Sequence, residues 1–410
     1  MFDFGKASAL AAVFVAGMTL SACGEAQSKY PGVTDKEIRL GTTMPFSGPV
    51  SLSSFVGKAM EAYYNKVNDE GGINGRKIRL IAYDDAYNPA KTVEQVRRLV
   101  ESDEVLAVVS PMGTAMNTAI RPYLNSRKVP QLFVVSGSPK FNDPKHYPWT
   151  MGWVPSNSSE GAIYGALVVK NKPNARIAVL SQNDDFGRDF LNGFKAALGD
   201  KASQIVATEY YDVSDPTVDS RVVSLAASGA DVFFDITQPK FAAQTIRKAA
   251  QLGWKPLQFL ISPSSTLSTV IEPAGFENAQ GIISSDYTKS ASDPTLKDDP
   301  GIEKFESYVA KYLPGVNKND RFVMNGYCFA QTMVEVSKRA GNNLTRENVM
   351  KQATSIHDLK LDCLLPGILI NTSSTNFVAV SQFQLMRFEG DRWVRVGEVI
   401  GTSAFPPAAE

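Results

Sequence analysis

The stretch that decides the fold is Val129-Pro130-Gln131-Leu132-Phe133-Val134-Val135, followed directly by Ser136-Gly137-Ser138-Pro139. A short apolar run bounded by turn residues is typical of a buried strand. The loop after it carries small, hydroxyl-bearing residues, whose N–H and O–H groups can face an anion without a charged side chain. We therefore interpret Ser136, Gly137 and Ser138 as the carboxylate-holding wall of a ligand cleft, although most loops of this composition are only turns.

Two earlier strand ends have similar chemistry. The loops after residues 37–44 and 105–110 supply Phe46, Ser47, Met112, Gly113 and Thr114. Helix-patterned segments separate the strands, which predicts β-α units around a parallel sheet. The carboxyl ends of parallel strands meet at one edge of the sheet, where ligands bind. We expect these loops to line one cleft.

A second series of β-α units begins after Trp153. Its expected strands lie at residues 176–181, 204–211, 232–236 and 257–261. They repeat the first series in order and rough length, which indicates a weak internal duplication of lobes. A chain of 410 residues is also too long for one ordinary core. The sequence therefore predicts an α/β protein with two lobes.

Composition argues against several classes of function. The formal net charge is zero, without a long basic run interleaved with aromatic residues, so nucleic acid is not an expected partner. The chain has only two histidines and three cysteines, which leaves almost no material for a histidine-based triad or metal site. No G-x-S-x-G elbow, phosphate-binding loop or zinc motif occurs. We expect neither an enzyme nor a bound cofactor or metal.

The N-terminus has the features of an export signal. Lys6 precedes an apolar run of small residues, Ala7 to Thr19, which ends in Leu20-Ser21-Ala22-Cys23. This pattern resembles the bacterial lipoprotein signal, which is cut before a lipid-modified cysteine. It predicts a lipid on Cys23 that anchors the mature protein to a membrane outside the cytoplasm. An ordinary secretory peptide or a short core helix is the alternative.

The other two cysteines leave two alternatives open. Cys328 and Cys363 could form a disulfide in an oxidising compartment. Cys328 also lies in an apolar helical pattern beside Tyr327 and Phe329, where a free buried cysteine is common.

Several motifs together resemble one family. They are Ile38-Arg39-Leu40-Gly41 with Phe46-Ser47-Gly48, the run Asp69 to Arg76, and Asp184-Asp185-Phe186-Gly187. From about Val33 to Val399 the chain resembles the substrate-binding proteins of branched-chain amino-acid ABC transporters. The resemblance implies two Rossmann-like lobes with parallel sheets, joined by three crossovers near Trp153, Tyr287 and Leu364. It also implies a monomer that closes on a ligand and passes it to a membrane permease.

The resemblance and the N-terminal pattern together give the expected organisation of the chain. It comprises a signal peptide (1–23), a tether (24–35), lobe one (36–153 and 288–363), lobe two (154–287 and 364–402) and a tail (403–410).

The resemblance also assigns ligand contacts. In the family, loops corresponding to Gly113-Thr114 and Ser136 to Ser138 hold a carboxylate, and Phe186 closes from lobe two. The acids expected to hold an α-ammonium fall on Ser264 and Asn157, and the expected tyrosines fall on Thr237 and Gln238. Trp153 and Tyr287 either line the cleft or are packing residues.

The missing acids change the expected ligand. A buried ammonium without a carboxylate partner is costly, whereas a ligand carboxylate keeps its partners here. The sequence therefore predicts a carboxylate without an α-amino group, of the benzoate or hydroxycinnamate type. A branched-chain amino acid remains the alternative, because a shifted alignment would bring Glu160 or Asp185 into the site. A role in a sensor or chemoreceptor system also stays open.

Overall fold

The computed structural model describes residues 1–2 and 30–406, whose strands form two separate sheets. The first sheet is parallel, in the order β2-β1-β3-β4-β5. Its strands are β1 (Glu37–Met44), β2 (Lys77–Asp84), β3 (Ala107–Val109), β4 (Gln131–Val134) and β5 (Thr150–Gly152). Leu40 of β1 pairs with Ala107 of β3, and Val109 of β3 pairs with Leu132 of β4, so the decisive apolar run lies directly beside the central strand.

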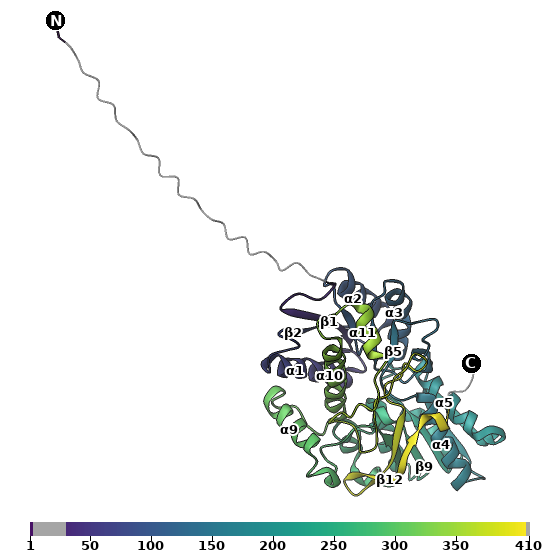
Figure 1. Ribbon diagram of the computed structural model, residues 1–410. Helices are drawn as coiled ribbons and strands as arrows, with labels where there is room; N and C mark the ends of the chain where they lie inside the picture. Colours follow the sequence, from purple (N-terminus) through teal and green to yellow (C-terminus); the bar gives the residue numbers. More distant parts are fainter. Residues whose placement is uncertain (3–29, 407–410) are drawn as a thin grey trace.

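Helices cover both faces of the first sheet (Figure 1). They are α1 (Phe55–Asp69), α2 (Pro89–Glu101), α3 (Thr114–Ser126), α9 (Pro300–Tyr312), α10 (Arg321–Ala340) and α11 (Arg346–Ala353). The α2–α3 pair encloses one apolar cluster with Val108, whereas α1 and α10 pack with Leu40 and Ala107 in another. Neighbouring strand residues point to opposite faces, so these two helix pairs lie on opposite sides of the sheet.

The second sheet has seven strands, in the order β12-β11-β10-β9-β8-β6-β7. The strands are β6 (Ile177–Gln182), β7 (Ile205–Tyr211), β8 (Val232–Ile236), β9 (Leu257–Leu260), β10 (Ile283–Asp286), β11 (Gln382–Glu389) and β12 (Arg392–Gly401). It is parallel from β7 to β10, and β11 and β12 add an antiparallel hairpin at the other edge. Together, the two sheets confirm the two-lobed α/β fold.

Helices α4 (Asn157–Asn171) and α5 (Asp185–Leu198) pack very closely in the second lobe. A Cβ atom on Gly161 would lie 2.1 Å from the Phe190 carbonyl oxygen, and one on Gly193 would lie 1.8 Å from that of Ser158. Glycine is therefore required at both contacts. The remaining helices of this lobe are α6 (Asp219–Ala227), α7 (Pro239–Gln251) and α8 (Glu272–Ala274).

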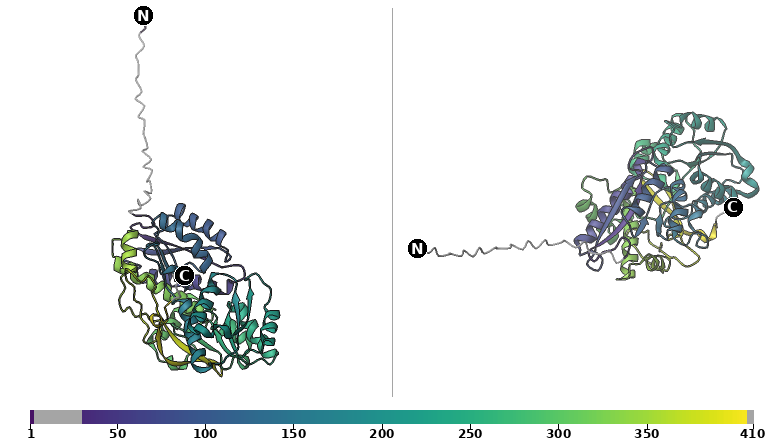
Figure 2. Two further views of the ribbon diagram at one scale, coloured as in Figure 1. Left: turned by 90° about the vertical axis from the view of Figure 1, so that its right-hand side faces the viewer. Right: turned by 90° about the horizontal axis from the view of Figure 1, so that it is seen from above.

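The chain passes between the lobes near β5, after β10 and before β11 (Figure 2). Cys328 of α10 is disulfide-bonded to Cys363, so the structure resolves the two alternatives for these cysteines in favour of a bridge. The lobe boundaries expected from the sequence remain our proposal. The lipidation site expected at Cys23 lies outside the described residues. No helix in the described part of the chain is long and apolar enough to cross a membrane.

Candidate functional site

A cavity lies between the two lobes, with about 660 Å³ of space that includes its open mouth. Its lining comprises Val50, Ser53, Tyr87, Met112, Gly113, Thr114, Val135, Ser136, Gly137, Val154, Pro155, Phe186, Gln238, Ser262, Pro263, Tyr287, Arg321, Phe322 and Asn325. The residues predicted from the sequence that lie among them are Met112, Gly113, Thr114, Ser136, Gly137, Phe186, Gln238 and Tyr287.

The serine loop leaves β4 through a backbone irregularity. Phe133 has a positive φ of 58°, and the β4–β5 register shifts between Gln131 and Val134. Such a bulge bends the strand and redirects the residues after it. The Ser136 hydroxyl lies 2.7 Å from that of Thr114 and accepts a hydrogen bond from the Ser138 N–H.

The other part of this wall is the beginning of α3. Gly113 precedes the helix with a φ of 98°, and a Cβ atom there would lie 2.0 Å from the Met116 methyl carbon. No side chain caps the N-terminus of α3, so its first N–H groups can face a ligand in the cavity. Together with the hydroxyls of Thr114 and Ser136, these N–H groups allow this wall to bind an anion.

Gly137 joins the serine loop to the first crossover. Its carbonyl oxygen accepts a hydrogen bond of 2.8 Å from the Asn157 N–H, and a Cβ atom on it would lie 2.3 Å from Asn157 Oδ1. Asn157 therefore supports the loop from behind and does not line the cavity. Ser138 is also absent from the lining, and its buried hydroxyl makes no hydrogen bond within the described residues.

Three further predicted residues lie near the cavity but outside its lining. Phe46 packs against the core, with its ring beside Gly57. Ser47 is exposed, and both its N–H and its hydroxyl donate to Asp84. Trp153 is a packing residue: its ring contacts Tyr287 and Phe329, and its N–H donates to a threonine of α10.

Lobe two contributes Phe186 at the start of α5 and Gln238 just before α7. The other two predicted residues of this lobe have internal partners. The Thr237 hydroxyl donates to Asp235, and the Ser264 hydroxyl donates to the Thr237 carbonyl oxygen. Burial raises the pKa of Asp235 to about 7. Thr237 and Ser264 therefore shape the loops behind the cavity and are not part of its surface.

The two acids that a shifted alignment would bring into the site do not line the cavity. Glu160 is buried and accepts hydrogen bonds from the Tyr164 hydroxyl and from the N–H and hydroxyl of Ser262. Burial raises its pKa. Asp185 forms ion pairs with Lys140 and Arg188, and the hydrogen bond from Lys140 lowers its pKa.

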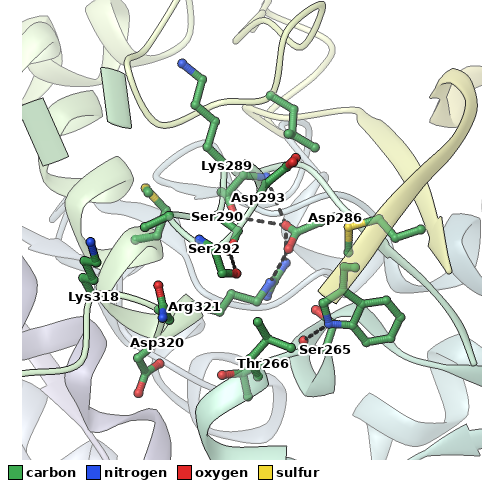
Figure 3. Close-up of a pocket in the computed structure, with 18 of the residues that line it drawn as sticks. Ser265, Thr266, Asp286, Lys289, Ser290, Ser292, Asp293, Lys318, Asp320 and Arg321 are labelled. Atoms are coloured by element: carbon green, nitrogen blue, oxygen red, sulfur yellow. Dashed lines mark hydrogen bonds and ion pairs between the residues drawn. The ribbon is translucent and has the colours of Figure 1, made fainter. Parts of the chain in front are cut away.

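The start of α10, where Arg321, Phe322 and Asn325 line the cavity, was not predicted from the sequence. The guanidinium of Arg321 donates to both carboxylate oxygens of Asp286, at 2.9 Å each (Figure 3). Burial alone would lower the pKa of Arg321, but Asp286 and Tyr287 more than offset this, so it lies above its ordinary value. No local motif marks these residues, because only the tertiary fold brings α10 to the cavity.

Arg321 also lines a second cavity, with about 600 Å³ of space that includes its open mouth (Figure 3). Its walls include Asp286, Thr266 and Trp393 of lobe two and Asp320 of lobe one. Arg321 therefore lines both cavities, whereas Asp286 lines the second one. Within the described residues, no group of three or more histidine, cysteine or acidic side chains is placed to hold a metal ion.

Two parallel-sheet lobes with a cavity between them define a class of solute-binding proteins. Residues 37–392 match the family described as periplasmic binding protein, and the chain belongs to this family. The resemblance found in the sequence is thereby confirmed. A relative from Brucella melitensis, "Leu/Ile/Val-binding protein homolog 3", is 24% identical over 328 residues, which cover 79% of this chain and 84% of the relative.

Solved structures have the same fold. A branched-chain amino-acid ABC transporter protein from Thermus thermophilus with bound valine aligns with a TM-score of 0.81 at 19% identity, over 90% of this chain and 98% of that one. A solute-binding protein from R. palustris in complex with benzoate aligns with a TM-score of 0.73 at 17% identity, over 91% of this chain and 98% of that one.

Proposed function

We propose that this protein captures a small carboxylate without an α-amino group, an aromatic acid of the benzoate or hydroxycinnamate type. It holds the ligand in the cavity between the lobes and delivers it to an ABC transporter permease. The observation that carries this proposal is the charge of the cavity lining. Among the described residues that line the cavity, Arg321 is the only one of an acidic or basic type, and no aspartate or glutamate is present.

This lining disfavours an ammonium group. Asp286 already has both oxygens bonded to Arg321, and Glu160 is occupied by Tyr164 and Ser262. A buried ammonium without a carboxylate partner costs several kcal/mol. A ligand carboxylate would instead accept hydrogen bonds from Thr114, Ser136 and the uncapped start of α3.

The walls between these polar groups suit an aromatic ring. Met112, Phe186, Tyr287 and Phe322 present apolar or aromatic surface to the cavity. Burying roughly 150 Å² of ring surface would contribute about 4 kcal/mol. This is comparable to the contribution expected from the hydrogen bonds to the carboxylate.

We extend the proposal to the setting of the protein. Export, with a lipid on Cys23, would place a monomer beside its permease in the periplasm. The role is binding and transport, without catalysis, cofactor or nucleic acid. The valine bound to one structural neighbour keeps a branched-chain amino acid as the second candidate ligand.

Calorimetry of the delipidated protein tests the choice of ligand. The panel contains leucine, isoleucine, valine, benzoate, 4-hydroxybenzoate and p-coumarate. We expect binding of at least one aromatic acid and no heat from the amino acids. Tight leucine binding with no response to any aromatic acid would overturn the proposal. Loss of affinity on Thr114→Ala, by about 1 to 3 kcal/mol, would place the carboxylate at the α3 wall.

A further inference from the structure

The cavity has polar groups on two opposite walls. Thr114 and Ser136 belong to the wall at the start of α3, whereas Arg321 and Asn325 belong to the wall at the start of α10. These helices cover opposite faces of the first sheet (Figure 1). A ligand bound at the α3 wall therefore has a second polar region at its far end.

Arg321 and Asn325 are one turn apart on α10, so they share a face of that helix. Both line the cavity. An arginine has five N–H donors. Asp286 takes two of those of Arg321, and the Tyr287 hydroxyl is a further partner, so the guanidinium is not fully used. Within residues 1–2 and 30–406, the Asn325 side chain accepts a long hydrogen bond of 3.5 Å from Thr288 at its oxygen, and its amide N–H₂ has no partner. The α10 wall therefore offers N–H donors.

The charge of the α10 wall restricts what these donors can bind. Arg321 is neutralised by Asp286, and both side chains are largely buried, at 7% and 10% exposure. A second carboxylate would meet no uncompensated positive charge there and would lie close to the Asp286 carboxylate. A neutral oxygen, such as a phenol hydroxyl, accepts the same hydrogen bonds without that desolvation and repulsion.

We infer that Arg321 and Asn325 form a subsite for a neutral oxygen at the far end of the ligand, and that the protein selects hydroxylated aromatic acids. This inference rests on the proposed function and names the ligand class more narrowly. The subsite prefers a hydroxyl to a bare ring, because the N–H donors lose their hydrogen bonds to water when the ligand binds and a bare ring offers no acceptor in return. It prefers a hydroxyl to a second carboxylate because the wall has no net charge.

Gln238 offers a matched control for this assignment. It is also an amide that lines the cavity, but it reaches it from lobe two, before α7. If the hydroxyl group binds at the α10 wall, replacing Asn325 changes the preference for it. Replacing Gln238 then changes the affinities for hydroxylated and unhydroxylated acids by the same factor.

The experiment measures benzoate, 4-hydroxybenzoate and terephthalate by calorimetry against the whole protein and two variants. We expect 4-hydroxybenzoate to bind about tenfold tighter than benzoate, and terephthalate more weakly than benzoate. Asn325→Leu should reduce the hydroxybenzoate preference to about one, and Gln238→Leu should keep it. Thermal melts establish that both variants are folded.

Three outcomes overturn the inference while leaving the proposed function intact. They are equal binding of benzoate and 4-hydroxybenzoate, tightest binding of terephthalate, and loss of the preference in Gln238→Leu but not in Asn325→Leu. Failure of the proposed function looks different, because then none of the three acids binds and leucine does. If Asn325→Leu is unfolded, Asn325→Ala replaces it in the same comparison.

Discussion

Two of the ion pairs that join the lobes differ in burial and position. Arg321–Asp286 links the start of α10 to the end of β10 beside the second crossover, with 7% and 10% of the side chains exposed. Lys140–Asp185 links a 3₁₀ turn of lobe one to the start of α5, with 28% and 27% exposed. Arg321 of the first pair lines the ligand cavity, whereas both residues of the second pair lie outside its lining.

We interpret this difference as one between a permanent part of the fold and a contact that forms when the lobes close. A buried pair has lost its water, so breaking it leaves an uncompensated charge inside the protein. A partly exposed pair exchanges protein partners for water at little cost. We call Arg321–Asp286 the inner pair and Lys140–Asp185 the outer pair. We expect the inner pair to contribute most to the stability of the fold, and the outer pair to adjust the equilibrium between open and closed lobes.

The largest effect is expected from Arg321→Ala. It leaves Asp286 buried without its cation and should lower the free energy of unfolding by about 3 to 5 kcal/mol, measured by urea unfolding. The paired variant Arg321→Met with Asp286→Leu should lose much less, because no charge is left unpaired. A paired variant as unstable as the single one would show that shape, and not charge, matters at this position.

The disulfide stabilises the same helix that carries Arg321 of the inner pair. It ties Cys328 of α10 to Cys363, whose carbonyl oxygen accepts a hydrogen bond from the Lys289 N–H, and it spans a sequence separation of 35. In the chain-entropy model, a loop of this length stabilises the fold by roughly 4 kcal/mol. Reduction should lower the melting temperature, and Cys328→Ser with Cys363→Ser should show the same loss without reductant. An unchanged melting temperature after verified reduction would contradict this expectation.

The stability contributions of Asp320, next to Arg321 of the inner pair, and of Asp185, in the outer pair, should depend on pH with opposite signs. Asp320 caps α10 and accepts a hydrogen bond from the Phe322 N–H, and burial raises its pKa to about 6. A raised carboxyl pKa means that ionisation destabilises the folded state, so this contribution falls as pH rises from about 4 to 6. Its size is on the order of 2 kcal/mol.

Asp320→Asn tests this contribution. Asparagine keeps the helix cap but does not titrate. The variant should therefore lose this component of the pH dependence of urea unfolding between pH 4 and 6. A pH profile identical to that of the wild type would rule out Asp320 as its source. Asp299→Asn is the control, because it also replaces a helix-capping aspartate, whose pKa is instead lowered.

The sequence predicted features that depend on neighbouring residues better than features that depend on contacts between distant residues. The apolar runs and their loops predicted the two lobes and indicated Thr114 and Ser136 as cleft residues, and the family resemblance added Phe186; all three line the cavity. Such features are local, since a strand and the loop after it are neighbours in the chain. Arg321 was missed because its partner Asp286 is 35 residues away and no spacing connects them. Thr237 and Ser264 were misplaced relative to the lining because their hydroxyl partners are set by tertiary packing.

The smallest effect is expected at the outer pair. Lys140→Ala should raise the dissociation rate of 4-hydroxybenzoate two- to fivefold in stopped-flow measurements, which corresponds to about 0.4 to 1 kcal/mol. Added salt should diminish the difference. The effect should persist from pH 5 to 8, because Lys140 lowers the pKa of Asp185 and the carboxylate loses its charge only in stronger acid.

Arg188→Ala is the control, since Arg188 also pairs with Asp185 but belongs to the same helix. Equal acceleration in both variants would mean that the charge on Asp185 matters only within lobe two, and that the lobes close without this contact.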